Sequence, residues 1–204
     1  MKQEERREQT KRLLHDTTVE LIREKGCSQT TLSDIMERSG LSKGAIFHYV
    51  SGKDELFVQV LENRLEEKNE QFMNVVKGLD IKEFEAPMNV ISSGLSRLEN
   101  KDDVANLILI YLIGKSDQPK VAEIVGNFYN QSIAFSKNWI MTGQNSGVIP
   151  AEIDPGQTAE LFELIAFGLR MRNLFAQKEY SFGVKEYSAF ISGLLQSTPR
   201  KEEE

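Results

Sequence analysis

The sequence contains few of the side chains on which disulfide-linked and metal-binding proteins depend. Cys27 is the single cysteine among 204 residues, which excludes a disulfide within the chain and favours a reducing, cytoplasmic location. Two histidines, His15 and His48, are too few for a cysteine–histidine metal site. The longest apolar run covers only residues 107–113, whereas a membrane-spanning helix needs about 20 residues. We therefore expect no metal, no cofactor and no membrane partner.

The net charge of −6 is unevenly distributed along the chain. Residues 1–60 contain equal numbers of basic and acidic side chains, so the whole excess of negative charge follows residue 60. An acidic protein repels nucleic acid, but a neutral N-terminal part whose basic residues gather on one face can still approach DNA. The charge pattern is thus compatible with a nucleic-acid partner for the N-terminal part.

Apolar residues at helical spacing run through the chain and predict an all-α fold. We expect a first helix that ends at Gly26 and a long helix that begins at the capping-box pair Ser51 and Asp54. Further helices are expected near residues 82–99, 102–114, 119–143, 155–178 and 184–196. A loop is expected at 144–154, where Asp154-Pro155 has the sequence of a helix N-cap followed by proline.

Two short helices are predicted between the first helix and the long one. Thr31 and Asp34 have the spacing of a capping box, and Gly40 ends the helix that they begin. Ser42 can cap the second short helix. Two short helices joined by a turn at glycine form the helix-turn-helix pattern.

The second short helix has an outer face that suits DNA. The apolar positions that would hold the three N-terminal helices together are Leu32, Ile35, Leu41, Ile46 and Val50. The outward positions, none of them acidic, are Ser42, Lys43, Ala45, His48 and Tyr49. Because a carboxylate there would be repelled by phosphate, this composition favours a helix that enters the major groove.

Residues 30–56, TTLSDIMERSGLSKGAIFHYVSGKDEL, resemble the DNA-binding signature of TetR-family transcriptional regulators. The chain departs from the family pattern at three positions, with Met36 for the usual alanine, Phe47 for tyrosine and Val50 for an aromatic residue. The resemblance implies a three-helix helix-turn-helix DNA-binding domain at 1–54 and a helical ligand-binding and dimerisation domain at 55–198. The proline and charged residues of 199–204 are expected to form a frayed tail.

The resemblance also implies contacts with double-stranded DNA. Thr31 would bind phosphate through its hydroxyl and its backbone N–H, and Lys53 would bind another phosphate. Residues expected at base edges are Ser42, Lys43, Gly44 and Ala45, and those expected at the DNA backbone and thymine methyl groups are Phe47, His48 and Tyr49. Two alternatives stay open here: Phe47 could belong entirely to the core, and Lys43 could be a solvated surface charge.

Apolar and aromatic stripes in the C-terminal part, together with the resemblance, predict a homodimer with a hydrophobic small-molecule effector. The expected ligand-binding residues are Leu109, Ile113, Phe128, Phe135, Trp139, Phe167 and Met171. The expected dimer-interface residues are Phe162, Ala166, Arg170, Tyr187, Phe190, Ile191 and Leu194. The alternative in both cases is that the stripes fill the core of a single subunit.

The sequence therefore predicts a ligand-responsive DNA-binding regulator, with repression favoured over activation. It would bind a palindromic operator as a homodimer and be released by an apolar or amphipathic effector. The alternative is an architectural DNA binder or a protein-binding adaptor without an effector. We identify no catalytic residue, because the sequence lacks a glycine-rich phosphate loop, a metal cluster and a catalytic triad. Cys27 is interpreted as a packing residue rather than a redox sensor.

Overall fold

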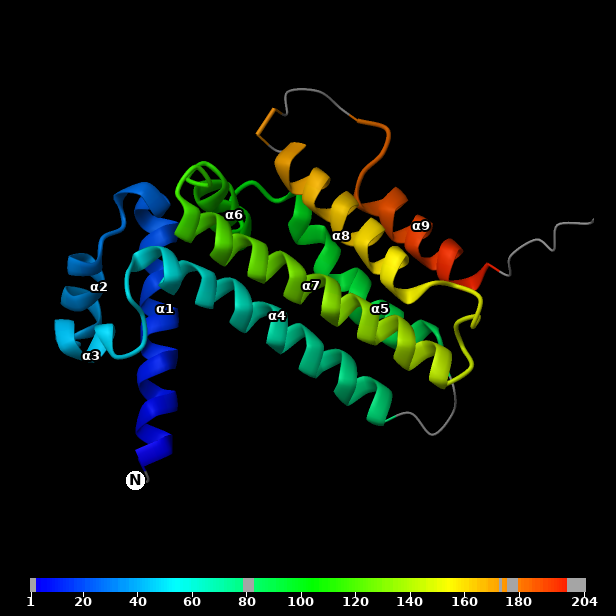
Figure 1. The fold of residues 1–204 in the computed structure, drawn as a ribbon, viewed down its shortest axis with the longest axis horizontal. Coiled ribbons are helices and arrows are strands. Elements are labelled where there is room, and N and C mark those ends of the chain that lie inside the picture. The colour runs from blue at the N-terminus through cyan, green and yellow to red at the C-terminus, as the bar shows by residue number, and fades with distance from the viewer. Residues whose placement is uncertain (1–2, 79–82, 173, 176–179, 198–204) are drawn as a thin grey trace, which may run out of the picture. The chain divides into compact units, whose positions relative to one another are not determined.

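The computed structural model describes residues 3–78, 83–172, 174–175 and 180–197. All regular secondary structure in these residues is helical (Figure 1), which confirms the predicted all-α fold. The elements are α1 (Gln3–Gln29), α2 (Leu32–Ser39), α3 (Lys43–Phe47), α4 (Lys53–Lys77), α5 (Glu85–Leu95), the 3₁₀ helix η1 (Ser96–Glu99), α6 (Val104–Ile113), α7 (Pro119–Asn145), α8 (Pro155–Arg172) and α9 (Val184–Gln196). No helix in this part of the chain is long and apolar enough to cross a membrane. The predicted tail at 199–204 lies outside the described residues.

The helices pack into two compact units that do not follow chain order. The first unit comprises residues 1–64 and 102–128, and the second comprises 65–101 and 129–204. Helices α4 and α7 therefore each have residues in both units. This division describes packing, and the functional boundary expected after residue 54 stays a prediction.

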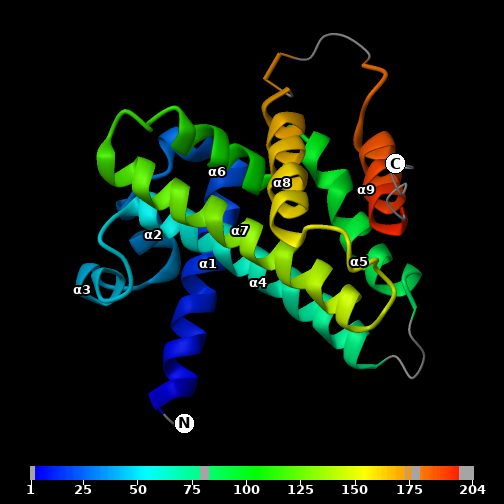
Figure 2. The same ribbon diagram turned by 45° about the vertical axis from the view of Figure 1, so that its right-hand side comes forward.

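In the first unit, α1, α2 and α3 lie near one another (Figure 2), and residues from all three helices belong to one apolar core. Its buried members are Leu14, Leu21, Ile35, Ile46, Val50 and Leu56. The predicted capping box of Thr31 and Asp34 is present at the start of α2, and Gly40 ends this helix in the left-handed conformation at φ 68°. At the start of α3, the Ser42 hydroxyl accepts the N–H of Ala45 at 3.2 Å, which confirms the predicted cap. The capping residues and Gly40 thus set the ends of the short helices that form the helix-turn-helix.

Two helix boundaries in the first unit differ from the predictions. Gly26 interrupts α1 at φ 78°, as expected, but a short helical turn continues beyond it to Gln29. The pairing expected between Ser51 and Asp54 is wrong, because the N–H and hydroxyl of Ser51 donate to Glu55 Oε2 at 2.8 and 2.5 Å. Asp54 instead accepts hydrogen bonds from Tyr111 and Lys115.

In the second unit, α5, α8 and α9 contribute to a separate apolar core. Tyr187 of α9 is buried in it and donates its hydroxyl proton to the carbonyl of Phe162 on α8, at 2.5 Å. Helix α8 begins as predicted, with Asp154 Oδ1 accepting the N–H groups of Gly156 and Gln157. It ends at Arg172, earlier than the expected residue 178, and residues 174–175 form a turn. Residues 173 and 176–179 lie outside the described part of the chain.

Candidate nucleic-acid interface

Helix α3 turns one face to the core and the other to solvent. Ile46 is 1% exposed, whereas Phe47, the next residue, is 44% exposed. The alternative that Phe47 belongs to the core is therefore wrong. The exposed candidates on and beside this helix are Ser42, Lys43, Gly44, Phe47 and His48, while Ala45 and Tyr49 are half-buried. Tyr49 packs against the core of the first unit, so it points outward less than predicted.

Lys43 and Phe47 lie one helical turn apart on the exposed face. The Lys43 ammonium is 5.6 Å from the centre of the Phe47 ring, within range of a cation–π contact. His48 follows Phe47 and meets the Tyr49 ring edge-on at 5.3 Å. The exposed face thus combines a positive charge, a bare apolar ring and an imidazole. These groups match phosphate, thymine methyl groups and base edges respectively.

The predicted phosphate contact of Thr31 does not fit the geometry. Its hydroxyl and its backbone N–H both donate to Asp34 Oδ2, at 2.6 and 2.7 Å. Lys25 pairs with the same oxygen at 2.7 Å. The Lys25 ammonium and the Thr31 hydrogen bonds hold the pKa of Asp34 well below its usual range. A carboxylate therefore takes the donors that phosphate would need, because the capping box satisfies them internally.

The predicted phosphate contact of Lys53 is also replaced by an internal role. Its ammonium donates to the carbonyls of Cys27, Ser28 and Thr30 at 3.1, 3.4 and 2.9 Å. These carbonyls follow the interruption at Gly26, where helical hydrogen bonding is broken. An ammonium has three donors, so all of them are used within the protein.

Lys53→Met should lower stability without removing a phosphate contact. Losing the three carbonyl contacts should cost about 1–3 kcal/mol, seen as a lower melting temperature by circular dichroism. The slope of log affinity for DNA against log salt should stay the same, whereas a lost phosphate contact would reduce it by about one unit. If Lys53→Met had an unchanged melting temperature and a shallower salt dependence of DNA binding, Lys53 would bind phosphate as the sequence predicts.

The start of α4 is also bonded to the segment around the end of α6. Asp54 accepts from the Tyr111 hydroxyl at 3.2 Å and pairs with the Lys115 ammonium. The Lys120 ammonium donates to the Ser51 hydroxyl at 2.6 Å. Sequence reasoning missed these residues, because partners about 60 positions apart leave no local pattern. All of them belong to the first unit, which also contains α3.

Cys27 has the properties of a packing residue. It is 6% exposed, and burial raises the pKa of its thiol to about 11. Reactive cysteines have the opposite character, with exposed thiols of lowered pKa. The interpretation of Cys27 as a structural residue therefore agrees with its environment.

The predicted ligand-binding residues are divided between the two packing units. Leu109, Ile113 and Phe128 belong to the first unit. The other four, in the second unit, are Phe135, Trp139, Phe167 and Met171. Within that unit Trp139 stacks on Phe72 with ring centres 5.2 Å apart. Its indole N–H donates to Asn69 Oδ1 at 2.8 Å.

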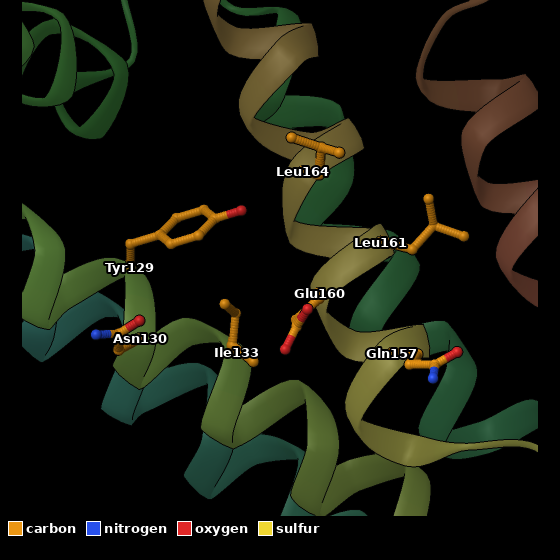
Figure 3. A pocket seen from close by; sticks show the side chains of 7 residues that line it. All are labelled: Tyr129, Asn130, Ile133, Gln157, Glu160, Leu161 and Leu164. Atoms are coloured by element: carbon orange, nitrogen blue, oxygen red, sulfur yellow. The ribbon is translucent and has the colours of Figure 1, made fainter.

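A pocket of about 480 Å³ lies between α7 and α8 in the second unit (Figure 3). Its lining residues are Tyr129, Asn130, Ile133, Gln157, Glu160, Leu161 and Leu164. None of the seven predicted ligand-binding residues lines it. Periodicity in the sequence identified the apolar helices correctly, but it could not indicate which of their faces would border this pocket.

Four of the predicted dimer-interface residues are buried within the single chain. Phe162, Ala166, Tyr187 and Ile191 are at most 7% exposed, so they have little surface left for a second copy. Arg170 and Leu194 are half-buried, and Phe190 is 39% exposed. The alternative that this stripe fills the core of one subunit is thus correct for the four buried residues.

Comparison with known proteins agrees with this geometry. Residues 14–60 match the family model described as bacterial regulatory proteins, tetR family. The HTH-type transcriptional regulator YfiR of Bacillus subtilis is 27% identical over 183 residues, covering 87% of this chain and 82% of that protein. Two similar solved structures are a TetR transcription regulator from Haloarcula marismortui, with 19% identity and a TM-score of 0.65, and Salmonella enterica GusR, with 18% identity and a TM-score of 0.61. Each alignment covers 92% of this chain, and they cover 97% and 96% of those chains respectively.

The helix-turn-helix on an otherwise helical chain defines a DNA-binding regulator of transcription rather than an enzyme. The match to the tetR family of bacterial regulatory proteins covers residues 14–60, the part of the chain that contains this helix-turn-helix.

Proposed function

We propose that this protein is a cytoplasmic repressor that binds a palindromic operator as a homodimer and releases it when a small-molecule effector binds. The observation that carries the proposal is the exposed face of α3, where Lys43, Phe47 and His48 project beyond a buried core. That face carries no carboxylate, and its Gly44 lets the backbone approach a groove closely. Thr31 and Lys53 are left out of the proposed DNA contacts, since their donors are used within the protein.

Lys43→Ala and Phe47→Ala should weaken binding to a duplex that the wild-type protein selects from a random library. Each loss should be about 5- to 100-fold, because phosphate, base-edge and methyl contacts contribute about 1–3 kcal/mol each. The salt dependence should become shallower for the lysine variant and stay unchanged for the phenylalanine variant. Affinity is measured by fluorescence anisotropy, and circular dichroism checks that helix content is retained.

Lys137→Ala serves as the matched control, because it removes a lysine from an exposed position on α7 in the second unit. It should bind the selected duplex as the wild type does. If both α3 variants bound the duplex with the wild-type affinity, the proposed contact of Lys43 and Phe47 with DNA would be contradicted.

Dimerisation is proposed through a stripe on α8 and α9 that a single chain leaves exposed. Leu161 and Leu164 of α8 are 39% and 63% exposed, and Phe190 of α9 is 39% exposed. Exposed glycines, Gly168 and Gly193, occur on the same two helices, where they would allow close approach of a partner helix. A second copy would bury these side chains and place two recognition helices on successive turns of DNA, about 34 Å apart. Because Leu161 and Leu164 also line the α7–α8 pocket, that pocket belongs to the proposed dimer contact.

Leu164→Glu should convert the dimer into monomers, since a charge would be buried without a partner. Analytical ultracentrifugation at micromolar concentration should show half the wild-type mass, and affinity for the palindromic duplex should fall. Met141→Glu, which alters a 41% exposed apolar residue on α7 outside the stripe, should remain dimeric. A dimeric Leu164→Glu protein would refute this interface.

Release by an effector is proposed because the second unit contains aromatic side chains that a small amphiphile could contact, among them Trp139. An effector weakens DNA binding only if it binds the released conformation more tightly than the bound one. The test is to screen amphiphilic compounds against the selected complex. If none of them weakens it, the alternative of an architectural DNA binder or protein-binding adaptor would replace the effector proposal.

A further inference from the structure

Helix α8 has a stripe of exposed residues on the side opposite its buried residues. The buried residues are Thr158, Ala159, Phe162, Ala166 and Leu169. The exposed side, called the α8 stripe below, continues past the end of the helix and consists of Gln157, Leu161, Leu164, Gly168, Met171 and Phe175. All of these residues are exposed except Met171, which is half-buried. Their spacing alternates between four and three residues, which is the repeat by which two helices pack along each other.

The two ends of the α8 stripe have complementary shapes. At the N-terminal end, Gln157, Leu161 and Leu164 line the α7–α8 pocket of about 480 Å³ (Figure 3). At the C-terminal end, the side chain of Phe175 is 73% exposed. Pockets of about 300–1,000 Å³ accommodate drug-sized molecules, so this one has room for a phenyl ring. One end of the stripe therefore offers a pocket, and the other end offers an exposed ring.

Contacts of Arg172 hold the end of α8 from which Phe175 projects. The N–H of Phe175 donates to the carbonyl of Arg172 at 3.0 Å. The Arg172 guanidinium donates to the carbonyl of Phe182 at 2.5 Å and to Glu99 Oε1 at 2.6 Å. It also lies 4.5 Å from the centre of the Tyr180 ring. Because the backbone at Phe175 is already positioned, using this ring in a contact has a low entropy cost.

The charges of α8 indicate that a second copy of the chain occupies the pocket. The acidic residues Glu160 and Glu163 lie in the N-terminal half of α8, and the basic residues Arg170 and Arg172 lie in its C-terminal half. Two antiparallel copies of α8 would place each acidic half beside a basic half, whereas parallel copies would place like charges together. An antiparallel pair also follows from a two-fold axis across the helix, and it brings Phe175 of each copy to the pocket end of the other.

The sizes of two side chains on the α8 stripe set the register of this pair. Leu164 is 63% exposed, whereas a Cβ added at Gly168 would meet no atom within 4 Å. If Leu164 lies opposite the partner's Gly168, the large side chain fills the space beside the small one. The same register places the partner's Phe175 opposite Gln157, at the pocket. By symmetry, each of these contacts occurs twice in the dimer.

We propose that α8 packs antiparallel on α8 of a second copy, and that each copy inserts Phe175 into the α7–α8 pocket of the other. This inference rests on the proposed dimerisation and specifies its register and the side chain that the partner contributes. The pocket then binds a side chain of the partner subunit rather than an effector.

Cross-linking between two cysteine variants tests the register. Full-length Gln157→Cys and Phe175→Cys proteins are mixed, left to exchange subunits and oxidised with copper phenanthroline. Covalent dimers should appear on non-reducing gels of the mixture and be absent from either variant alone. A disulfide needs Cα atoms about 6 Å apart, whereas two copies of the same position would be separated by roughly 25 Å along the antiparallel helices.

Gln71→Cys is the matched control, because it changes another exposed glutamine, on α4 outside the pocket lining. Mixed with Phe175→Cys, it should give no covalent dimer. The wild type should give none either, since its Cys27 is buried.

Removing the Phe175 ring should weaken the dimer. Phe175→Ala should raise the dimer dissociation constant about 10- to 1,000-fold, because two buried aromatic contacts are lost in each dimer. Phe182→Ala removes a 41% exposed ring that is not on the α8 stripe, and it should change this constant less than about threefold. Analytical ultracentrifugation over a dilution series gives the constants, and circular dichroism checks that both variants keep their helix content.

A change at Gly168 tests its proposed contact with Leu164. Gly168→Leu should weaken the dimer, because two leucines would then compete for one space. It should keep its helix content, since the position is open within one chain and leucine favours helix more than glycine does. Adding Leu164→Ala should restore dimerisation to within about tenfold of the wild type, as expected for residues in direct contact.

The inference is overturned if a dimeric wild type gives no covalent dimer in the mixture of Gln157→Cys and Phe175→Cys. It is also overturned if Phe175→Ala or Gly168→Leu dimerises as tightly as the wild type. These results would leave the proposed homodimer and its DNA binding intact. A wild type that is monomeric at micromolar concentration would instead refute both this inference and the proposed homodimer.

Discussion

The position of α3 depends on how the chain satisfies its carbonyl groups after Gly26. Gly26 breaks α1, and the carbonyls that follow would otherwise lack partners. Lys53 binds three of them from the first residue of α4. Thr30, one of these acceptors, directly precedes the cap of α2 at Thr31. The Lys53 ammonium therefore links the end of α1, the start of α2 and the start of α4. Helix α3 lies in the chain between α2 and α4.

The start of α4 is held by further contacts beside Lys53. Asp54, next to Lys53, is bonded to Tyr111 and Lys115, so the start of α4 is fixed on two sides within the first unit. Helix α4 continues without a break to Lys77 and includes Lys68 in the second unit. An effector bound in the second unit, as in the proposed function, would act on α3 only through a difference in affinity between two arrangements. Because α4 has residues in both units, a change in either unit could shift the equilibrium between these two arrangements.

Local signals were sufficient to predict much of this structure. The caps at Thr31, Ser42 and Asp154 were predictable because each pairs groups within three residues. Apolar stripes in the sequence identified the helices, but a stripe does not show whether it packs within one chain or against a second copy. Phe162 and Tyr187, expected at a dimer contact, cover each other within one chain. The proposed interface falls instead on neighbours such as Leu164, which periodicity alone could not separate from them.

Lys53 and Lys68 show where sequence reasoning reaches its limit. Both are lysines on α4, and neither has an adjacent partner that would mark its role. Lys53 has three carbonyl acceptors from residues more than 20 positions away, so its charge is fully used in holding the fold. Lys68 is half-buried, and its ammonium lies 5.6 Å from the centre of the Trp139 ring. A cation whose donors are all used within the protein contributes to the stability of the fold, as at Lys53. Tertiary contacts, rather than residue type, therefore distinguish these two lysines.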